Sequence, residues 1–254
     1  MRFRWQTRPG VPGLEPKAGE RWLFLMPHDD DTVIGAGLAV AAAIEAGCTV
    51  TVAITTDGGL GYCDAADRNR IASIRRKETE EALQLIGNPA VRFLNFPDGD
   101  LSRRQGRRLT GELAGGIQEA YTRLYRELRP DALFLCSASD IHPDHKIVYL
   151  EALISLFHAA GDIWPDLGAV LTDLPRIYEF PVYCALENPP EYRLLANDVA
   201  LERKLTAVAA YRSQRQISLL VDKLKTGGPQ EFYRRVEFAL YDPQGYAALF
   251  EADS

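Results

Sequence analysis

Short apolar runs alternate along the chain with longer amphipathic stretches. Residues 21–26 and 131–136 are nearly continuous apolar runs, and residues 49–54 are rich in β-branched side chains; both patterns are typical of buried strands. Residues 33–44 form a longer run of small apolar residues, which favours a helix packed closely on a sheet. A strand, a helix and a strand within about 35 residues form a βαβ unit and predict a parallel sheet with a right-handed crossover.

The pattern continues over most of the chain and predicts an α/β fold. We expect further strands at residues 91–95, 131–136, 176–180 and 182–184, helices at 69–86, 110–128, 143–159 and 198–211, and amphipathic stretches near 216–225 and 229–240. Residues 1–20 are rich in proline, glycine and charge, so we expect an irregular N-terminal arm there. Residues 21–254 lack a linker and an internal repeat. They predict a single α/β domain, Rossmann-like and three-layered, with a mostly parallel sheet.

Composition narrows the class of partner. The 254 residues carry a net charge of −6, which argues against general affinity for nucleic acid and favours a small or uncharged partner. No segment approaches the roughly 20 apolar residues of a membrane helix, and the N-terminus does not read as a signal sequence. We therefore expect a cytoplasmic protein without a membrane span, and the sequence leaves a homo-oligomer open. The cysteines are far apart, without CxxC spacing, and are expected to be buried free thiols: Cys48, Cys63, Cys136 and Cys184.

An acidic turn follows the first predicted strand of the parallel sheet. His28 is followed by three carboxylates, Asp29, Asp30 and Asp31. Adjacent carboxylates repel and are costly to desolvate unless a cation offsets them. His28 and Asp31 are spaced to bind one ion, and imidazole with carboxylate suits Zn²⁺ or another divalent transition metal. The alternative is a solvated loop in which Asp31 or Thr32 caps the next helix.

A second polar turn follows the strand at residues 131–136. It runs from Ser137 to His145, and Pro143 suits the first turn of a helix. The carboxyl ends of parallel strands meet at one edge of a sheet, so His28, Asp31 and His145 are expected to form a His₂Asp set with an open position, as in catalytic zinc sites. The fourth histidine of the chain, His158, lies late in the helix and is interpreted as a packing residue.

These residues suit metal-assisted hydrolysis of an amide or ester. A metal ion lowers the pKa of bound water and polarises a carbonyl, while Asp30 takes the water's proton. His142 is spaced to face the oxygen on which charge develops, helped by the positive end of its helix. Asp144 either orients a neighbouring imidazole or is an acidic residue in the first turn of the helix.

The two turns resemble the motifs of zinc-dependent de-N-acetylases related to N-acetylglucosaminyl-phosphatidylinositol deacetylase and the LmbE-like proteins. Their first motif is usually His-Pro-Asp-Asp-Glu and their second His-Pro-Asp-His; the counterparts are residues 28–32 and 142–145. The resemblance implies a Rossmann-like fold with its site at the carboxyl ends of the strands. It also implies roles for the following residues: metal ligation by His28, Asp31 and His145, Asp30 as general base, and His142 stabilising the oxyanion or protonating the leaving amine.

Further matches extend from about residue 21 to residue 214. Thr56-Asp57-Gly58, Arg75 to Glu78, Pro97-Asp98-Gly99 and Lys204 to Gln214 look like segments of the same family. The resemblance implies substrate contacts by Arg75 and Asp98, although Arg75 is also spaced to pair with Glu78 or Glu80 on a solvated helix. The loop after Asp98 carries arginines that form either a solvated basic loop or an anion site: Arg103, Arg104, Arg107 and Arg108.

The chain departs from the family motif at two positions. Asp29 replaces the usual proline and adds negative charge, and Thr32 replaces the usual glutamate, which leaves the orientation of the substrate open. The activity that the resemblance implies is removal of an acetyl group from an N-acetylglucosamine-type amino sugar or conjugate, whereas the spacing of the residues alone predicts only metal-assisted hydrolysis. The alternatives are an amidase for a larger N-acyl group and a non-catalytic sugar-binding module. A dinucleotide site is disfavoured because the first turn lacks G-x-G-x-x-G.

Overall fold

Eight strands form one mixed sheet in the computed structural model, which describes residues 2–111, 115–238 and 242–251. Their order across the sheet is β1-β7-β8-β6-β5-β2-β3-β4. Five neighbouring strands are parallel: β4 (Ala90–Phe96), β3 (Thr49–Thr56), β2 (Arg21–Met26), β5 (Ala132–Cys136) and β6 (Arg176–Phe180). The remaining strands are antiparallel to their neighbours: β8 (Gln230–Arg235), β7 (Tyr192–Ala196) and β1 (Phe3–Thr7). The predicted α/β fold with a mostly parallel sheet is therefore confirmed.

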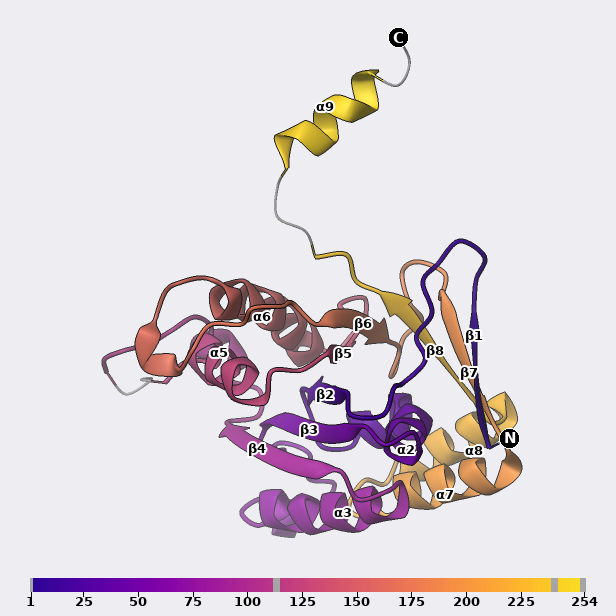
Figure 1. Cartoon of the computed structure of the whole chain (residues 1–254). Helices are drawn as coiled ribbons and strands as arrows, with labels where there is room; N and C mark the ends of the chain where they lie inside the picture. The colour runs from indigo at the N-terminus through magenta and orange to yellow at the C-terminus, as the bar shows by residue number, and fades with distance from the viewer. Residues whose placement is uncertain (1, 112–114, 239–241, 252–254) are drawn as a thin grey trace.

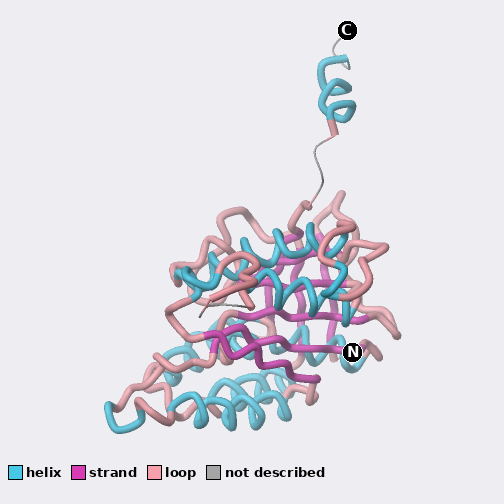
Figure 2. Tube along the Cα trace, turned by 90° about the vertical axis from the view of Figure 1, so that its left-hand side faces the viewer, coloured by secondary structure: helices cyan, strands magenta, loops and turns pink. Residues whose placement is uncertain are grey.

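Helices cover both faces of the sheet, as Figures 1 and 2 show. One face carries α1 (Asp31–Gly35), α2 (Gly37–Glu45), α3 (Ile71–Leu85), α7 (Asp198–Ala209) and α8 (Ile217–Gly227). The other face carries α5 (Ile117–Leu128) and α6 (Pro143–Ala160). The other helical segments are α4 (Leu101–Arg104), α9 (Pro243–Glu251) and the 3₁₀ turns η1 (Ala65–Asp67) and η2 (Pro165–Leu167). Among the helices within the described ranges, none combines the length and apolarity needed to cross a membrane.

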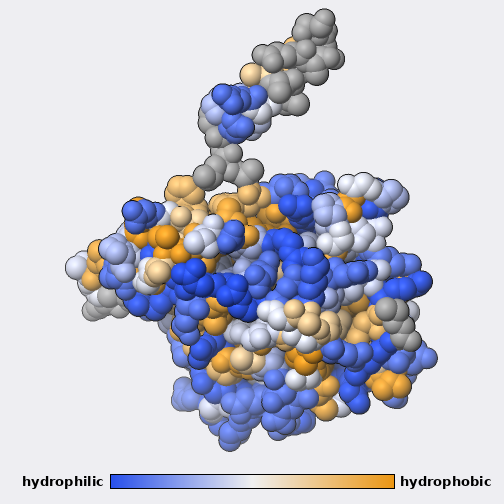
Figure 3. Space-filling view, in the orientation of Figure 1, coloured by the Kyte–Doolittle hydropathy of each residue, from blue (hydrophilic) through white to orange (hydrophobic). Residues whose placement is uncertain are grey.

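The central strands are apolar because both of their faces are buried. In β2, Trp22 and Phe24 pack into the core under α2 and α7, whereas Leu23 and Leu25 pack into the core under α5 and α6. Successive side chains of a strand point to opposite faces, so a strand covered by helices on both sides needs a continuous apolar run. Hydrophilic side chains cover most of the outer face seen in Figure 3, in keeping with the net negative charge.

The N-terminal arm differs from its prediction. Residues 1–20 are not irregular throughout, because Phe3–Thr7 form β1 and pair in antiparallel fashion with β7. The strand predicted at 182–184 is absent from the described residues, and β7 and β8 were not predicted as strands. All four cysteines are free, as predicted; Cys48 and Cys136 are buried, while Cys63 and Cys184 are only partly so. The single domain over residues 21–254 stays a prediction.

The helix predicted over residues 33–44 is broken at Ala36, and a buried ion pair accounts for the break. The Glu231 carboxylate of β8 accepts hydrogen bonds from the backbone N–H groups of Leu38 (2.8 Å) and Ala39 (2.9 Å), the first turn of α2. It also receives Lys204 Nζ at 2.7 Å and the Tyr233 hydroxyl at 2.5 Å. We call these five residues the Glu231 network. A carboxylate is favourable at a helix N-terminus, where N–H groups lack partners within the helix.

Candidate active site

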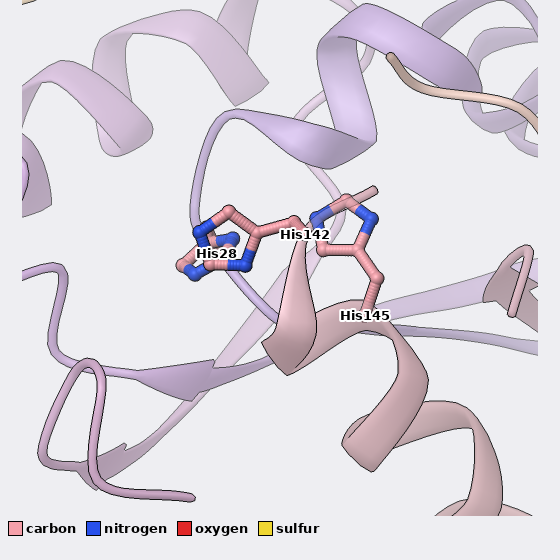
Figure 4. Close-up of side chains that lie close together, drawn as sticks. All are labelled: His28, His142 and His145. Atoms are coloured by element: carbon pink, nitrogen blue, oxygen red, sulfur yellow. The ribbon is translucent and has the colours of Figure 1, made fainter. Parts of the chain in front are cut away.

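The two polar turns meet at one edge of the sheet. β2 and β5 are parallel neighbours, so the turn at His28–Asp31 and the turn leading to α6 leave the sheet side by side. Figure 4 shows the three histidines of these turns close together. The ring centroid of His142 lies 4.5 Å from that of His28 and 5.4 Å from that of His145, and the centroids of His28 and His145 are 5.5 Å apart.

The Asp31 carboxylate lies between two of these imidazoles. Its Oδ2 accepts a hydrogen bond from the His28 backbone N–H at 2.9 Å and lies 3.4 Å from His28 Nδ1. Its Oδ1 lies 3.3 Å from His145 Nε2. Asp31 and His145 are fully buried, and His28 is 6% exposed. Two imidazole nitrogens therefore face the two oxygens of one buried carboxylate.

The opposite nitrogen of each imidazole faces an outer carboxylate. His28 Nε2 lies 3.3 Å from Asp144 Oδ2 and 3.5 Å from Asp98 Oδ1. His145 Nδ1 lies 3.5 Å from Asp140 Oδ2, which also accepts the Tyr183 backbone N–H at 2.9 Å. A histidine that binds a metal ion commonly donates its other ring N–H to a carboxylate, which fixes the tautomer and the ring orientation.

The pKa values of the cluster follow from this arrangement. Burial lowers the pKa of His28, but its hydrogen bonds to Asp144, Asp31 and Asp98 outweigh burial and hold that pKa well above the ordinary value. Burial likewise lowers the pKa of His145, but the charge of Asp31 and the nearby Asp140 carboxylate raise it to about 9. Burial alone would raise the pKa of Asp31, yet the two imidazoles hold it far below its usual range. The cluster thus pairs carboxylates with protonated imidazoles, and a divalent cation would displace those protons.

Unpartnered buried atoms test whether a metal ion fits. Asp31 Oδ1, Asp30 Oδ1 and both ring nitrogens of His145 are buried without a hydrogen-bond partner. Such atoms are costly to bury unless a ligand satisfies them. The described residues offer three groups whose ligand atoms lie within 4.8 Å of one another: His28, His142 and His145; Asp31, Cys136 and His145; and His28, Asp98 and Asp144. The residues present could therefore hold a metal ion with nitrogen and oxygen donors.

Asp30 lies beside this cluster, and one of its carboxylate oxygens has no hydrogen bond. The residue is 5% exposed, and its Oδ1 lies 3.2 Å from Arg75 Nη2 without a hydrogen bond. Burial raises the pKa of Asp30, Arg75 opposes that rise, the charges of Asp31 and Asp29 add to it, and the resulting pKa is about 6. A carboxylate with such a pKa can accept a proton near neutral pH.

His142 is held as a hydrogen-bond donor. It is the N-cap of α6, and its Nδ1 accepts the Asp144 backbone N–H at 3.2 Å. Because Nδ1 accepts, the neutral ring carries its proton on Nε2. Burial lowers the pKa of His142, and the charges of His28 and His145 lower it further, so the neutral form prevails at pH 7.

Asp98 and Arg75, for which the resemblance implies substrate contacts, are bonded to other residues of the protein. Asp98 is beside His28, and its Oδ2 accepts the Leu60 backbone N–H at 3.1 Å. Arg75 is 4% exposed and forms ion pairs with Asp29 and Asp30. The alternative pairing of Arg75 with Glu78 is not formed; the Glu78 carboxylate instead accepts both the backbone N–H and the hydroxyl of Ser213.

The arginines of the loop after Asp98 form ion pairs and hydrogen bonds with other residues of the protein. Arg103 and Arg104 form ion pairs with Asp100, and Arg108 donates to the Gln105 carbonyl. Arg107 pairs with Asp166 and Glu119 and is nearly buried, with its guanidinium 4.9 Å from the Trp164 ring centroid. The interpretation as a fully solvated basic loop therefore fails for Arg107.

Sequence reasoning missed Asp140 and Tyr183. Asp140 was visible in the same turn as the two histidines, and its spacing before His142 and His145 was the signal available. Tyr183, whose ring centroid lies 5.6 Å from that of His145, follows β6 without any motif. No pattern in the sequence indicates that Tyr183 lies beside His145. His158 contacts the Trp164 ring at 4.3 Å between centroids, as a packing residue would.

Known proteins resemble this chain in sequence. Residues 23–155 match the family model described as GlcNAc-PI de-N-acetylase. The 1D-myo-inositol 2-acetamido-2-deoxy-alpha-D-glucopyranoside deacetylase of Kineococcus radiotolerans is 30% identical over 184 residues, which are 63% of this chain and 51% of that protein. The diacetylchitobiose deacetylase of Thermococcus kodakarensis is 27% identical over 199 residues, 76% of this chain and 69% of that protein.

A solved structure is similar over most of the chain. The N,N'-diacetylchitobiose deacetylase from Pyrococcus horikoshii superimposes with a TM-score of 0.69 at 25% identity, covering 85% of this chain and 84% of that one. The chain spans about half the length of the Kineococcus relative, so the match leaves the other half of that protein without a counterpart here.

Proposed function

The chain belongs to the GlcNAc-PI de-N-acetylase family, and from that premise we propose that it is a metal-dependent hydrolase that removes the acetyl group from an N-acetylglucosamine-type amino sugar or a conjugate of one. The names of the relatives support this substrate class, because each describes a deacetylase of an acetylated amino sugar. One observation carries the proposal. The Asp31 carboxylate lies between His28 Nδ1 and His145 Nε2, beside Asp30, whose Oδ1 is buried without a hydrogen bond.

Three residues would hold the metal ion, which we propose to be Zn²⁺ or another divalent transition metal. His28, Asp31 and His145 supply two imidazoles and a carboxylate, a donor set that suits these ions. When bound, the ion activates water and polarises the acetyl carbonyl. The outer carboxylates orient the two imidazoles through the ring nitrogens that face away from Asp31: Asp144 and Asp98 orient His28, and Asp140 orients His145.

The remaining residues perform the proton transfers and stabilise charge. Asp30 takes a proton from the attacking water as the water oxygen bonds to the acetyl carbon. His142 Nε2–H donates to the carbonyl oxygen as it becomes an oxyanion, and the N-terminus of α6 favours the same negative charge. The C–N bond then breaks, Asp30 returns the proton to the amine nitrogen, and acetate and the free amino sugar are released.

Two rival functions remain to be tested against this one. An amidase for a larger N-acyl group would use the same residues with a wider acyl pocket. A non-catalytic sugar-binding module of the same fold would need neither a buried general base nor a histidine held as a donor, so Asp30 and His142 argue against it. A cytoplasmic location stays a prediction, and the oligomeric state stays open.

The test is release of primary amine from a panel of N-acetylglucosamine conjugates by the zinc-loaded protein. We expect turnover by the wild type, and we expect Asp30→Asn to bind zinc normally but to lose about 10²–10⁴-fold in kcat, the usual contribution of a general base. The exposed Asp222→Asn on α8 serves as the matched control and should keep full activity. Binding of zinc without release from any acetylated sugar would overturn the proposal, and N-acyl conjugates with longer chains would then test the amidase alternative.

A further inference from the structure

Asp29 stands where the family motif usually has proline, and its side chain is buried against Arg75. Asp29 is 5% exposed and Arg75 4%. Arg75 Nε donates to Asp29 Oδ2 at 3.0 Å, and Arg75 Nη2 donates to Asp29 Oδ1. A guanidinium and a carboxylate joined through two parallel hydrogen bonds hold each other in a fixed orientation. Proline offers no acceptor at this position, so the pair depends on the residue particular to this chain.

The same guanidinium reaches the general base proposed above. Arg75 Nη2, which bonds to Asp29, lies 3.2 Å from Asp30 Oδ1. Asp30 has carboxylate neighbours on both sides in the chain, and Arg75 is the arginine that forms an ion pair with it among the described residues. The Asp29 pair therefore fixes a positive charge beside a carboxylate that has like charges on both sides in the chain.

Two further elements hold this pair in place. The Thr79 hydroxyl of α3 donates to the Arg75 carbonyl at 2.8 Å and lies 3.4 Å from Asp29 Oδ2. Tyr211, just after α7, donates its hydroxyl to the Asp29 carbonyl at 2.6 Å. Asp29 is thus held through both its side chain and its backbone, and the guanidinium has little freedom to turn toward a ligand.

A glycine loop covers Arg75 on the solvent side. A Cβ atom at Gly61 would lie 2.0 Å from Arg75 Nη1, and one at Gly58 would lie 3.3 Å from its Cδ and Nε. The loop is anchored by Gln214, whose side-chain amide donates to the Gly61 carbonyl at 2.6 Å. With the loop in this position, Arg75 Nη1 lies against the backbone of Gly61.

We propose that Arg75 is a positioning residue for Asp30 rather than a ligand of the substrate, and that Asp29 is the residue that holds it in this role. The inference rests on the proposed function, because it assigns Asp30 as the general base. It separates this chain from the usual family motif, in which proline at the position of Asp29 supplies no carboxylate for the arginine.

Steady-state kinetics on an accepted substrate separate the two roles of Arg75. We expect Asp29→Asn and Arg75→Lys each to lower kcat by up to about 100-fold, the effect of a small misplacement of a catalytic group, and to leave KM within twofold of the wild type. Arg70→Lys is the matched control: Arg70 forms an exposed pair with Asp67 at the start of α3, and the variant should change neither constant. A tenfold rise in KM for Arg75→Lys with kcat unchanged would overturn the proposal.

The double variant tests whether the two residues act as one unit. If Asp29 acts through Arg75, then Asp29→Asn/Arg75→Lys loses no more kcat than the worse single variant, whereas independent roles multiply. Asp29→Glu, which keeps a carboxylate acceptor, should retain more kcat than Asp29→Asn. Multiplicative losses, or equal losses for the Glu and Asn variants, would contradict the proposed link.

A substrate-free measurement separates failure of this inference from failure of the proposed function. In crystal structures of the zinc-loaded wild type and Asp29→Asn, we expect the Arg75 guanidinium to move away from Asp30 in the variant. A guanidinium that stays at Asp30 would overturn the role of Asp29, whether or not any sugar is deacetylated. If Asp29→Asn does not fold, N-acetylglucosamine binding by Arg75→Lys decides instead: unchanged affinity is expected, and a tenfold loss would overturn the proposal.

Discussion

Two clusters of buried charge differ in how completely their polar atoms are paired. In the Glu231 network, the Lys204 ammonium, two amides of α2 and the Tyr233 hydroxyl all bond to one carboxylate. No side-chain atom of Lys204 or Glu231 appears among the unpartnered buried atoms of the described residues. The second cluster, which we call the catalytic cluster, contains His28, Asp30, Asp31, His142 and His145. Here Oδ1 of Asp30, Oδ1 of Asp31 and both ring nitrogens of His145 have no hydrogen bond. Complete pairing marks a structural cluster, and incomplete pairing marks a place for a ligand.

The two clusters are joined by α1. Asp31 begins α1, and the Glu231 network binds the first turn of the next helix, α2. The structural cluster therefore fixes the backbone that presents Asp31 to the two imidazoles. The comparison predicts that changes in the cluster around Asp31 affect metal binding and catalysis without lowering the free energy of unfolding, whereas changes in the Glu231 network lower it.

The largest effect is expected for His145→Ala. The variant removes the ring nitrogen that faces Asp31, so we expect loss of bound zinc and a fall in activity of more than about 1,000-fold, since metal activation of water is lost. Zinc content by elemental analysis and amine release are the measurements. His158→Ala, farther along the same helix, should retain both. Full zinc content in His145→Ala would show that His145 is not a ligand.

The next largest effect is expected for Lys204→Met. It leaves the Glu231 carboxylate buried without its cation, and breaking one side of a buried ion pair costs about 3–5 kcal/mol of unfolding free energy. Urea unfolding followed by circular dichroism measures the loss. Lys204→Met/Glu231→Gln removes both charges and should recover part of it. A loss of unfolding free energy below about 1 kcal/mol would mean that the Glu231 network does not stabilise the fold.

A change of opposite sign is expected for Asp30→Asn in the metal-free protein. The pKa of Asp30 is raised from 3.8 to about 6, so the ionised carboxylate is disfavoured in the fold above that pH. About two pKa units at 1.36 kcal/mol each give up to about 3 kcal/mol at pH 7. Asp30→Asn should therefore raise the unfolding free energy at pH 7, and the gain should shrink as pH falls through 6 toward 4, where wild-type Asp30 protonates. A gain that grows in acid would contradict this account.

The smallest effect is expected for Asp140→Asn. Burial raises the pKa of Asp140, but the neighbouring His145 imidazole and the hydrogen bond from the Tyr183 backbone lower it to about 2, so the group is ionised at neutral pH. Removing the charge behind His145 should weaken zinc binding by about 10–100-fold, as is usual for a carboxylate behind a ligating histidine. Competition with a zinc chelator measures this change, with Asp100→Asn as the control. Unaltered affinity would mean that Asp140 does not orient His145.

Local pattern was sufficient for the parallel part of the sheet and insufficient for the antiparallel part. β2 and β5 are almost entirely apolar and β3 is rich in β-branched residues, and such runs can be recognised without knowledge of their partners. β8 is different because Glu231 points into the core, where a strand pattern would require an apolar residue. The buried Glu231 carboxylate is tolerated because Lys204 and backbone amides of α2 donate hydrogen bonds to it. These donors are remote from Glu231 in the sequence.

The site divides in the same way. His28, Asp31, His142 and His145 lie in two short segments whose spacing and strand context predict their convergence. The Asp29–Arg75 pair could not be predicted from the motif, since that position is normally proline and the arginine is 46 residues away. Tyr183 reaches the site from a loop after β6, and only the order of the strands brings it there.

The position of β1 has a consequence for synthesis of the chain. β1 is bonded only to β7, β7 to β8, and β8 joins the parallel strands through β6. On the ribosome, the parallel strands from β2 to β6 can assemble as they emerge, but β1 has no place in the sheet until residues 230–235 have been made. Phe3 and Trp5, which pack against the core in the finished fold, are therefore accessible to chaperones, and to other nascent chains, through most of translation.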